Sequence, residues 1–175
     1  HRMTYGRKEV SGECTLYQGD CWEVMPARGR FEHVFCEPPF EQLMHDLHSK
    51  VEFRRTDGNA ARKHFTFSGI DVLRPVLVQA VEECCDGWFL AFCTAEGVWK
   101  WREESTLNTG MKFQTTCPWI KPDCAPKFNA QGPAVGYEPF ITVWAGRGHA
   151  RWNAGGKRGG YTHNVNPSDR HRAHP

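Results

Sequence analysis

Short apolar runs that alternate with amphipathic stretches most constrain how this chain can fold. The strand-like runs span residues 33–36, 88–93, 113–121 and 140–144, with a shorter candidate at 14–17. Between the first two, apolar residues recur at the three- and four-residue spacing of a helix; they are Ile70, Leu73, Leu77, Val81 and Cys84. A second helical stripe follows at Val98, Trp101 and Leu107. Strand, helix, strand, helix, strand predicts an α/β domain with crossover helices.

Proline and glycine mark the boundaries of these elements. Pro75 is tolerated only near the first turn of a helix, so the first helix is expected to begin around residues 68–71. Residues 122–137 are rich in Pro, Gly and Asn, and they predict a long loop that joins the last two strands without a helix.

The sequence Glu37-Pro38-Pro39-Phe40 directly follows the first strand. In open α/β sheets, ligands bind at the carboxyl ends of strands. Consecutive prolines fix their own φ angles and favour extended conformations before them, so this turn is stiff. One interpretation is a simple strand terminator. The other is a pocket in which the Glu37 carboxylate and the Pro38 carbonyl accept hydrogen bonds from a planar amine while Phe40 stacks on its ring.

Positive charge is concentrated in two segments. The net charge of the 175-residue chain is only +2, which does not by itself indicate a nucleic-acid partner. Basic residues gather, however, in segments 41–68 and 146–172, which lack a regular apolar pattern and are predicted to be loops. A single basic loop is usually solvated surface, whereas two of them favour a polyanion partner.

The eight cysteines do not form a metal or disulfide pattern. There is no Cys-x-x-Cys pair, and most cysteines lie in apolar segments, where a free thiol behaves as a small hydrophobic group. His45 and His48 are three residues apart but lack further ligands nearby in sequence. We therefore expect free cysteines, a reducing compartment and no metal.

Length and hydropathy bound the remaining possibilities. A chain of 20.0 kDa is expected to form one domain over residues 14–175, with residues 1–13 as an extension that carries a tag remnant before Met3. No apolar run reaches the roughly 20 residues of a membrane span, and no signal peptide is expected.

Two long segments resemble the DNA amino-methyltransferases that modify adenine N6 or cytosine N4, particularly small phage and prophage members. The first is LYQGDCWEVMPARGRFEHVFCEPPF, with Gly-Asp before a short helix and the catalytic strand end after it. The second is WIKPDCAPKFNAQGPAVGYEPFITVWAGRGHARWNAGGKRGGYTH. The resemblance runs from Cys14 over nearly the whole chain. It implies a Rossmann-like methyltransferase sheet, S-adenosylmethionine as cofactor, DNA as substrate and a role in restriction-modification in the bacterial cytoplasm.

The resemblance also assigns roles to residues. It places the catalytic motif at Glu37, Pro38, Pro39 and Phe40 and the cofactor contacts at Asp20, Cys36 and Glu37. Trp119, Lys121 and Glu138 match signature positions around the pocket. The residues expected to contact nucleic acid are Arg54, Arg55, Arg62, Lys63, Lys121, Arg151, Trp152, Lys157 and Arg158.

The sequence departs from the family pattern at two points. Glu37 stands where the family usually has Asp, Asn or Ser. The glycine-rich cofactor turn should follow a His-Pro-Thr-x-Lys-Pro signature, and residues 173–175 stop inside that signature. Gly146-Arg147-Gly148 does not replace the turn, because basic loop sequence and not a helix follows it. We therefore expect an incomplete sheet, which a second copy or another chain would complete.

Three functions remain open at this point. The first is transfer of a methyl group to a flipped base in DNA, with adenine N6 favoured over cytosine N4. The second is a catalytically inactive nucleic-acid-binding remnant or subunit with the same scaffold. The third is methylation of an amine in RNA or protein by the same motif chemistry.

Overall fold

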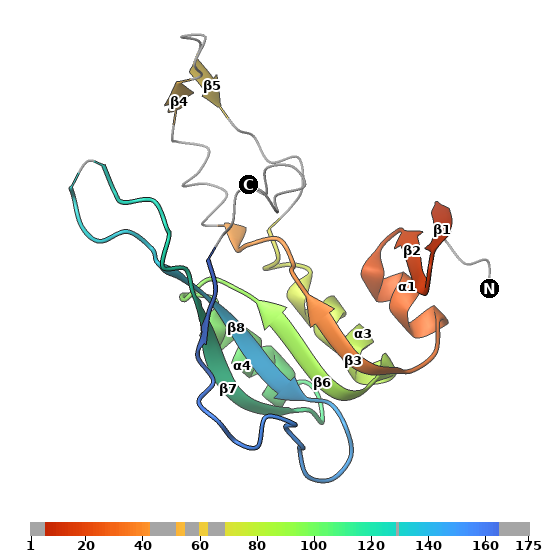
Figure 1. Cartoon of the computed structure of the whole chain (residues 1–175). Coiled ribbons are helices and arrows are strands. Elements are labelled where there is room, and N and C mark those ends of the chain that lie inside the picture. Colours follow the sequence, from red (N-terminus) through yellow and green to blue (C-terminus); the bar gives the residue numbers. More distant parts are fainter. Residues whose placement is uncertain (1–5, 43–51, 55–59, 63–68, 129, 165–175) are drawn as a thin grey trace.

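The computed structural model describes residues 6–42, 52–54, 60–62, 69–128 and 130–164. Its main element is a five-stranded sheet in the order β3 (Phe31–Cys36), β6 (Cys85–Phe92), β8 (Tyr137–Trp144), β7 (Lys112–Ile120) and β9 (Tyr161–Thr162). β3 and β6 are parallel, β8 lies antiparallel between β6 and β7, and β9 is parallel to β7. Figure 1 shows this sheet in front of the helices. The expected α/β fold class is confirmed.

Two helices cover one face of the sheet. α3 (Arg74–Cys84) connects the parallel strands β3 and β6, which need a crossover of this kind. α4 (Val98–Leu107) connects β6 to β7. The shorter helix α1 (Cys21–Ala27) precedes β3 and packs against α3. The hydrophobic core therefore lies between the sheet and the α3–α4 layer.

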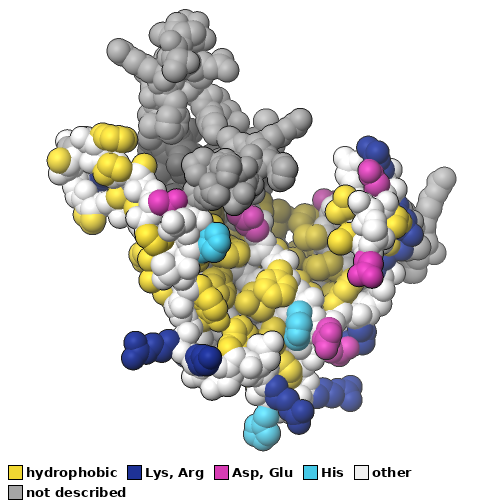
Figure 2. All heavy atoms as spheres, viewed as in Figure 1, with side chains coloured by type: hydrophobic (Ala, Val, Ile, Leu, Met, Phe, Trp, Pro, Cys, Tyr) yellow, Lys and Arg dark blue, Asp and Glu magenta, His cyan; other side chains and the backbone are white. Residues whose placement is uncertain are grey.

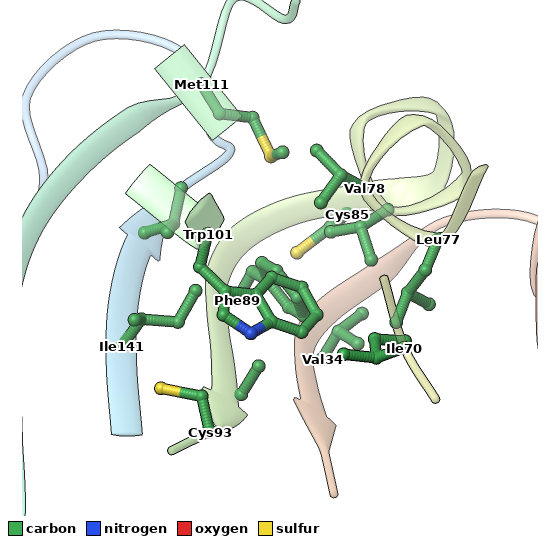
Figure 3. Close-up of a cluster of buried hydrophobic side chains, with 13 residues drawn as sticks. Val34, Ile70, Leu77, Val78, Cys85, Phe89, Cys93, Trp101, Met111 and Ile141 are labelled. Atoms are coloured by element: carbon green, nitrogen blue, oxygen red, sulfur yellow. The ribbon is translucent and has the colours of Figure 1, made fainter. Parts of the chain in front are cut away.

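Alternate strand residues form this core. Val34 on β3, Phe89 on β6 and Ile141 on β8 point toward the helices and are almost inaccessible to solvent. They meet Leu77 from α3 and Trp101 from α4, as the close-up of Figure 3 shows. Because successive side chains of a strand point to opposite faces, the neighbouring residues face the other side of the sheet.

That other side, which we call the open face, is rich in aromatic rings. Trp88 lies edge-on to Trp144 and Trp152, with ring centroids 5.2 and 4.8 Å apart. Nearer the carboxyl end of β6, the ring centroid of Phe92 lies 6.0 Å from that of Trp119 and 5.4 Å from that of Phe140. Figure 2 is viewed from this side and shows hydrophobic side chains gathered over the sheet.

The strand candidate at 14–17 forms, but not in the main sheet. It is β2 (Cys14–Gln18), which pairs with β1 (Arg7–Ser11) in a separate two-stranded sheet. Apart from the half-buried Tyr17, its side chains are exposed, so it has too little apolar surface for a sheet interior. The fifth strand of the main sheet is instead β9. The boundary expected at residue 14 lies within the β1–β2 hairpin.

Two details of the helices differ from expectation. α3 begins at Arg74, and residues 70–73 form a turn in which the Ile70 carbonyl accepts bonds from Leu73 and Arg74. Pro75 has no N–H to continue this ladder, which delays the regular helix. In α4, Leu107 is 73% exposed, while Ser105 is buried one turn after Trp101. Residue 107 is six positions beyond 101 and so lies on the far side of the helix.

The remaining segments contain little regular structure. Within the segment predicted as the first basic loop, β4 (Glu52–Arg54) and β5 (Ala60–Arg62) form a short antiparallel hairpin. The loop between β7 and β8 contains no helix or strand among its described residues, as predicted. None of the described helices has the length and hydrophobicity that crossing a bilayer would require.

Candidate active site

The carboxyl ends of β3 and β6 define one edge of the sheet, and the sequence-predicted motif lies there. Cys36, the last residue of β3, pairs with Ala91 near the end of β6. Because β8 is antiparallel, its first residues reach the same edge, where Glu138 pairs with Trp119 of β7. Glu37, just after β3, therefore lies at the same edge as Glu138 of β8 and Trp119 of β7, with β6 between β3 and β8. The carboxyl edge is where α/β folds bind ligands.

The four residues of the motif have distinct environments. Glu37 is exposed, Pro38 is buried, and Pro39 and Phe40 are half-buried. Glu37 continues the alternation of β3 after Phe35 and so belongs to the open face. The Phe40 carbonyl accepts a bond from the Ile70 amide at 3.1 Å, so the turn is tied to the segment that leads into α3.

Of the three residues predicted to contact the cofactor, Cys36 and Glu37 are adjacent in sequence, and Asp20 directly precedes Cys21, whose charge acts on Cys36. Asp20 is exposed immediately before α1, and its carbonyl accepts bonds from the Glu23 and Val24 amides at 3.0 Å each. Burial, with the nearby Cys21 and Glu37 charges, raises the pKa of the Cys36 thiol to about 12. Burial also raises the pKa of Cys21, and the Asp20 charge adds to this effect. The start of α1 thus lies beside the end of β3.

The raised pKa of Cys36 limits its chemistry. A thiol that ionises near pH 12 is protonated at neutral pH, and the thiolate is the nucleophilic form. Cys36 also packs against the hydrophobic core. Its position in this site is therefore that of a neutral packing group beside the exposed Glu37 carboxylate.

Lys121 and Glu138 form an ion pair at the far side of the same edge. The Lys121 ammonium also lies 4.4 Å from the centroid of the Trp119 ring, a cation–π contact. Tyr161 of β9 pairs with Trp119 and packs 5.7 Å from Phe140. This edge therefore combines a fixed charge pair with several aromatic rings on the open face. Because Lys121 already has a carboxylate partner, it is less suited to neutralise a phosphate.

Two other residues predicted to contact nucleic acid, Arg151 and Trp152, lie away from the motif. Arg151 is exposed, and its carbonyl accepts a bond from Trp88 Nε1 at 2.7 Å. Trp152 is half-buried against Trp88. Trp88 pairs with His33, three residues before Cys36, so this contact lies roughly 10 Å along the strand from Cys36 and further from the motif. Lys157 and Arg158 are exposed between this point and β9.

The first basic segment is only partly described. Arg54 lies on β4 and pairs with Ala60, whereas Arg62 lies on β5 and pairs with Glu52. Arg55 and Lys63, together with His45 and His48, lie outside the described residues. Within the described ranges, no three His, Cys, Asp or Glu side chains are placed to hold a metal ion. All eight cysteines are described, and each is a free thiol.

Two hollows are found among the described residues. One of about 380 Å³ is bordered by Trp22 of α1 and by Val76 and Gln79 of α3. The second, of about 190 Å³, is on the open face near Phe35, Trp88 and Trp152. Neither of these two hollows has Glu37 among its lining residues.

Sequence reasoning missed Glu41, the residue that directly follows the motif. It is 5% exposed and forms an ion pair with Arg74, which is 3% exposed, at 3.1 Å. Charged side chains are rarely buried without a partner. The partner is 33 positions away, so periodicity did not identify it. The one available signal was an acidic residue directly after an otherwise apolar turn.

Comparison with solved structures identifies the fold. The chain superposes on the crystal structure of the M1.HpyAVI–SAM complex, a DNA methyltransferase, with a TM-score of 0.53 and 10% identity over 82% of this chain. It matches the crystal structure of M1.HpyAVI with a TM-score of 0.52 and 11% identity, also over 82% of this chain.

The match has a limited extent. The chain spans 61% and 64% of the length of these two structures. No protein-family model matches the chain, and no curated protein matches it significantly. At this level of identity the likeness concerns the fold, and the chain has the α/β fold seen in these methyltransferase structures.

Proposed function

We propose that this chain belongs to an S-adenosylmethionine-dependent methyltransferase that acts on the exocyclic amine of a base in DNA, adenine N6 in preference to cytosine N4. The observation that carries the proposal is the Glu37–Phe40 turn at the carboxyl edge, with the exposed Glu37 carboxylate beside the start of α1. An acidic first residue in this motif favours adenine in the family that the sequence resembles.

The residues at this edge fit the cofactor and the amine. We expect the exposed Asp20 carboxylate, one residue before Cys21, to accept hydrogen bonds from ribose hydroxyl groups. The charge of Cys21 acts on Cys36, which supports this placement. When bound, S-adenosylmethionine supplies the methyl group as an electrophile. The Cys36 thiol stays neutral beside it and leaves the Glu37 carboxylate as the charged acceptor at this point.

The motif would activate the amine by accepting its hydrogen bonds. The lone pair of an exocyclic amine is delocalised into the ring, which makes the nitrogen a poor nucleophile. If Glu37 and the Pro38 carbonyl each accept one N–H, the nitrogen becomes more pyramidal and its lone pair localises. The exposed Glu37 carboxylate can then pass the surplus proton to solvent. Phe40 and the aromatic rings of the open face offer stacking surfaces for a flipped base.

Glu37 places the carboxylate further from the backbone than Asp would. One added methylene extends the side chain by about 1.5 Å. A displacement near 1 Å can cost about 100-fold in rate when geometry is demanding. We therefore expect Glu37→Asp to change the turnover rate strongly. A decrease would show that the site geometry requires the longer Glu side chain, and an increase would show that it suits Asp better.

The test has two stages. Calorimetric titration of S-adenosylmethionine into the chain should show saturable binding, and labelled methyl groups should then be transferred to duplex DNA. Glu37→Ala should reduce the transfer rate by about 100-fold or more, since an acceptor at the reacting amine is lost. Glu32→Ala is the matched control, because Glu32 is an exposed glutamate on the same strand but distant from its carboxyl end. Equal rates for Glu37→Ala and wild type would contradict the proposal.

A second candidate, a nucleic-acid-binding subunit without catalysis, is favoured by Glu37 itself and by the open edge of β3. No strand pairs with the outer edge of β3 within the described ranges. Unpaired edges of this kind accept strands from other chains, so a second copy or another chain is a proposed partner. Salt-dependent DNA binding without cofactor binding or methyl transfer would favour this candidate over the enzyme.

A further inference from the structure

Both oxygens of the buried Glu41 carboxylate are bound by other elements. Oε1 accepts a bond from the Arg74 guanidinium, at the start of α3, at 3.1 Å. Oε2 accepts a bond from the Thr94 hydroxyl, just beyond β6, at 2.7 Å. Thr94 in turn accepts the Gly97 amide at 3.0 Å, at the start of α4. One carboxylate therefore joins the exit of the motif to the starts of both helices that cover the sheet.

The space around Glu41 fits this carboxylate closely. A Cβ added to Gly97 would lie 1.8 Å from Glu41 Oε1, so a side chain at residue 97 would displace the carboxylate. The Arg74 guanidinium also lies 5.2 Å from the Trp101 ring centroid. Since Arg74 is held by both an ion pair and an aromatic ring, its orientation toward Glu41 is well defined.

The residues on either side of Glu41 are tied to the same region. The Phe40 carbonyl accepts the Ile70 amide at 3.1 Å. The Gln42 amide donates to Asp71 Oδ2 at 2.7 Å, and Asp71 Oδ1 accepts from Lys100 at 2.8 Å. Three consecutive residues after the prolines are thus fixed by separate bonds.

We propose that Glu41, Arg74 and Thr94 are positioning residues that orient the Glu37–Phe40 turn for methyl transfer. A Pro-Pro turn is stiff internally, so it moves as a unit about its two ends. Pairing of Cys36 with Ala91 fixes the first end, and the Glu41 carboxylate fixes the second. The orientation of the Glu37 carboxylate then follows from both anchors.

This inference rests on the proposed function, but the anchoring of the turn through Glu41 can be tested without measuring methyl transfer. Thr94→Val is nearly isosteric, and it removes the hydroxyl that bonds Glu41 Oε2. It should lower the transfer rate at saturating substrate by about 10- to 100-fold, with DNA KM and cofactor affinity within about 2-fold of wild type. Thr94→Ser keeps a hydroxyl and should restore at least half of the rate.

Hydrogen exchange provides the readout that does not depend on activity. In Thr94→Val, the amides of Ile70 and Gln42 should exchange at least 10-fold faster, because the residues around Glu41 lose an anchor. Amides paired between β7 and β8 should be unchanged. Thr106→Val is the matched control, since the exposed Thr106 hydroxyl bonds, among the described residues, only the Arg102 and Glu103 carbonyls of its own helix.

The outcomes separate the two proposals. A wild type that transfers methyl groups, with Thr94→Val equally active per folded molecule, would overturn the positioning role. An inactive wild type would refute the proposed function for this chain. The exchange rates would then test only whether Thr94 helps to anchor the residues around Glu41. Unchanged exchange at Ile70 and Gln42 in Thr94→Val would overturn that anchoring role.

Discussion

The two faces of the sheet are built from alternate residues of the same strands, yet their chemistry differs. On the helix-covered face, Val34 is 8% and Phe89 0% exposed. On the open face, the next residue, Phe35, is 75% exposed, and aromatic rings predominate around it. The helix-covered face is closed by packing, whereas the open face combines buried rings such as Trp88 and Phe140, each 9% exposed, with the exposed ring of Phe35. The proposed catalytic turn, Glu37–Phe40, lies at the carboxyl edge of this sheet.

The largest expected effect is the loss of stability when one phenylalanine is removed from the helix-covered face, compared with one removed from the open face of the adjacent strand. Phe89→Ala should destabilise the fold by about 3–5 kcal/mol, because it leaves a cavity in a closed core. Phe35→Ala removes the same ring from the open face of the neighbouring strand and should change stability by less than about 0.5 kcal/mol. Urea denaturation of both variants measures the difference. Similar losses would mean that the open face is packed in solution, for example by a partner.

A smaller effect on stability is expected from the charge of the Asp71 carboxylate. Burial opposes ionisation of Asp71, but the bonds from Lys100 and Gln42 outweigh it and hold the Asp71 pKa below its usual range. A lowered folded-state pKa gives stability that is present above the unfolded pKa, near 3.9, and is lost as pH falls through the folded pKa. Stability should therefore decrease below about pH 4.

Asp71→Asn tests this dependence. The variant should be less stable than wild type at pH 7, and its stability should fall less between pH 5 and pH 2. Asp86→Asn is the control, because the pKa of Asp86 is also lowered, by its hydrogen bond with Arg30, but the pair is exposed. Exposed pairs contribute little, so this change should be smaller. An acid profile of Asp71→Asn identical to that of wild type would exclude the Asp71 contribution.

Much of this two-faced sheet follows from local sequence pattern. The strands near 33–36, 88–93, 113–121 and 140–144 could be predicted because each is a short apolar run bounded by polar or turn-forming residues. The placement of β8 between β6 and β7 depends on contacts between distant segments, which no local period encodes. The same holds for Glu41, whose partners Arg74 and Thr94 come from other elements. The motif could be located in the sequence, but the bonds that anchor it depend on contacts between distant segments.

The last prediction concerns the rate at which cysteine thiols are alkylated, which should differ between buried and exposed positions. Burial raises the pKa of both Cys36 and Cys93 to about 12, so almost no thiolate is present at pH 8. Cys14 on β2 is exposed. With limiting iodoacetamide, peptide mass spectrometry should find Cys14 alkylated well before Cys36 and Cys93, and denaturant should abolish the difference. Early alkylation of Cys36 in the native protein would show that the motif edge opens, and its thiol would then have to be reconsidered as a reactive group.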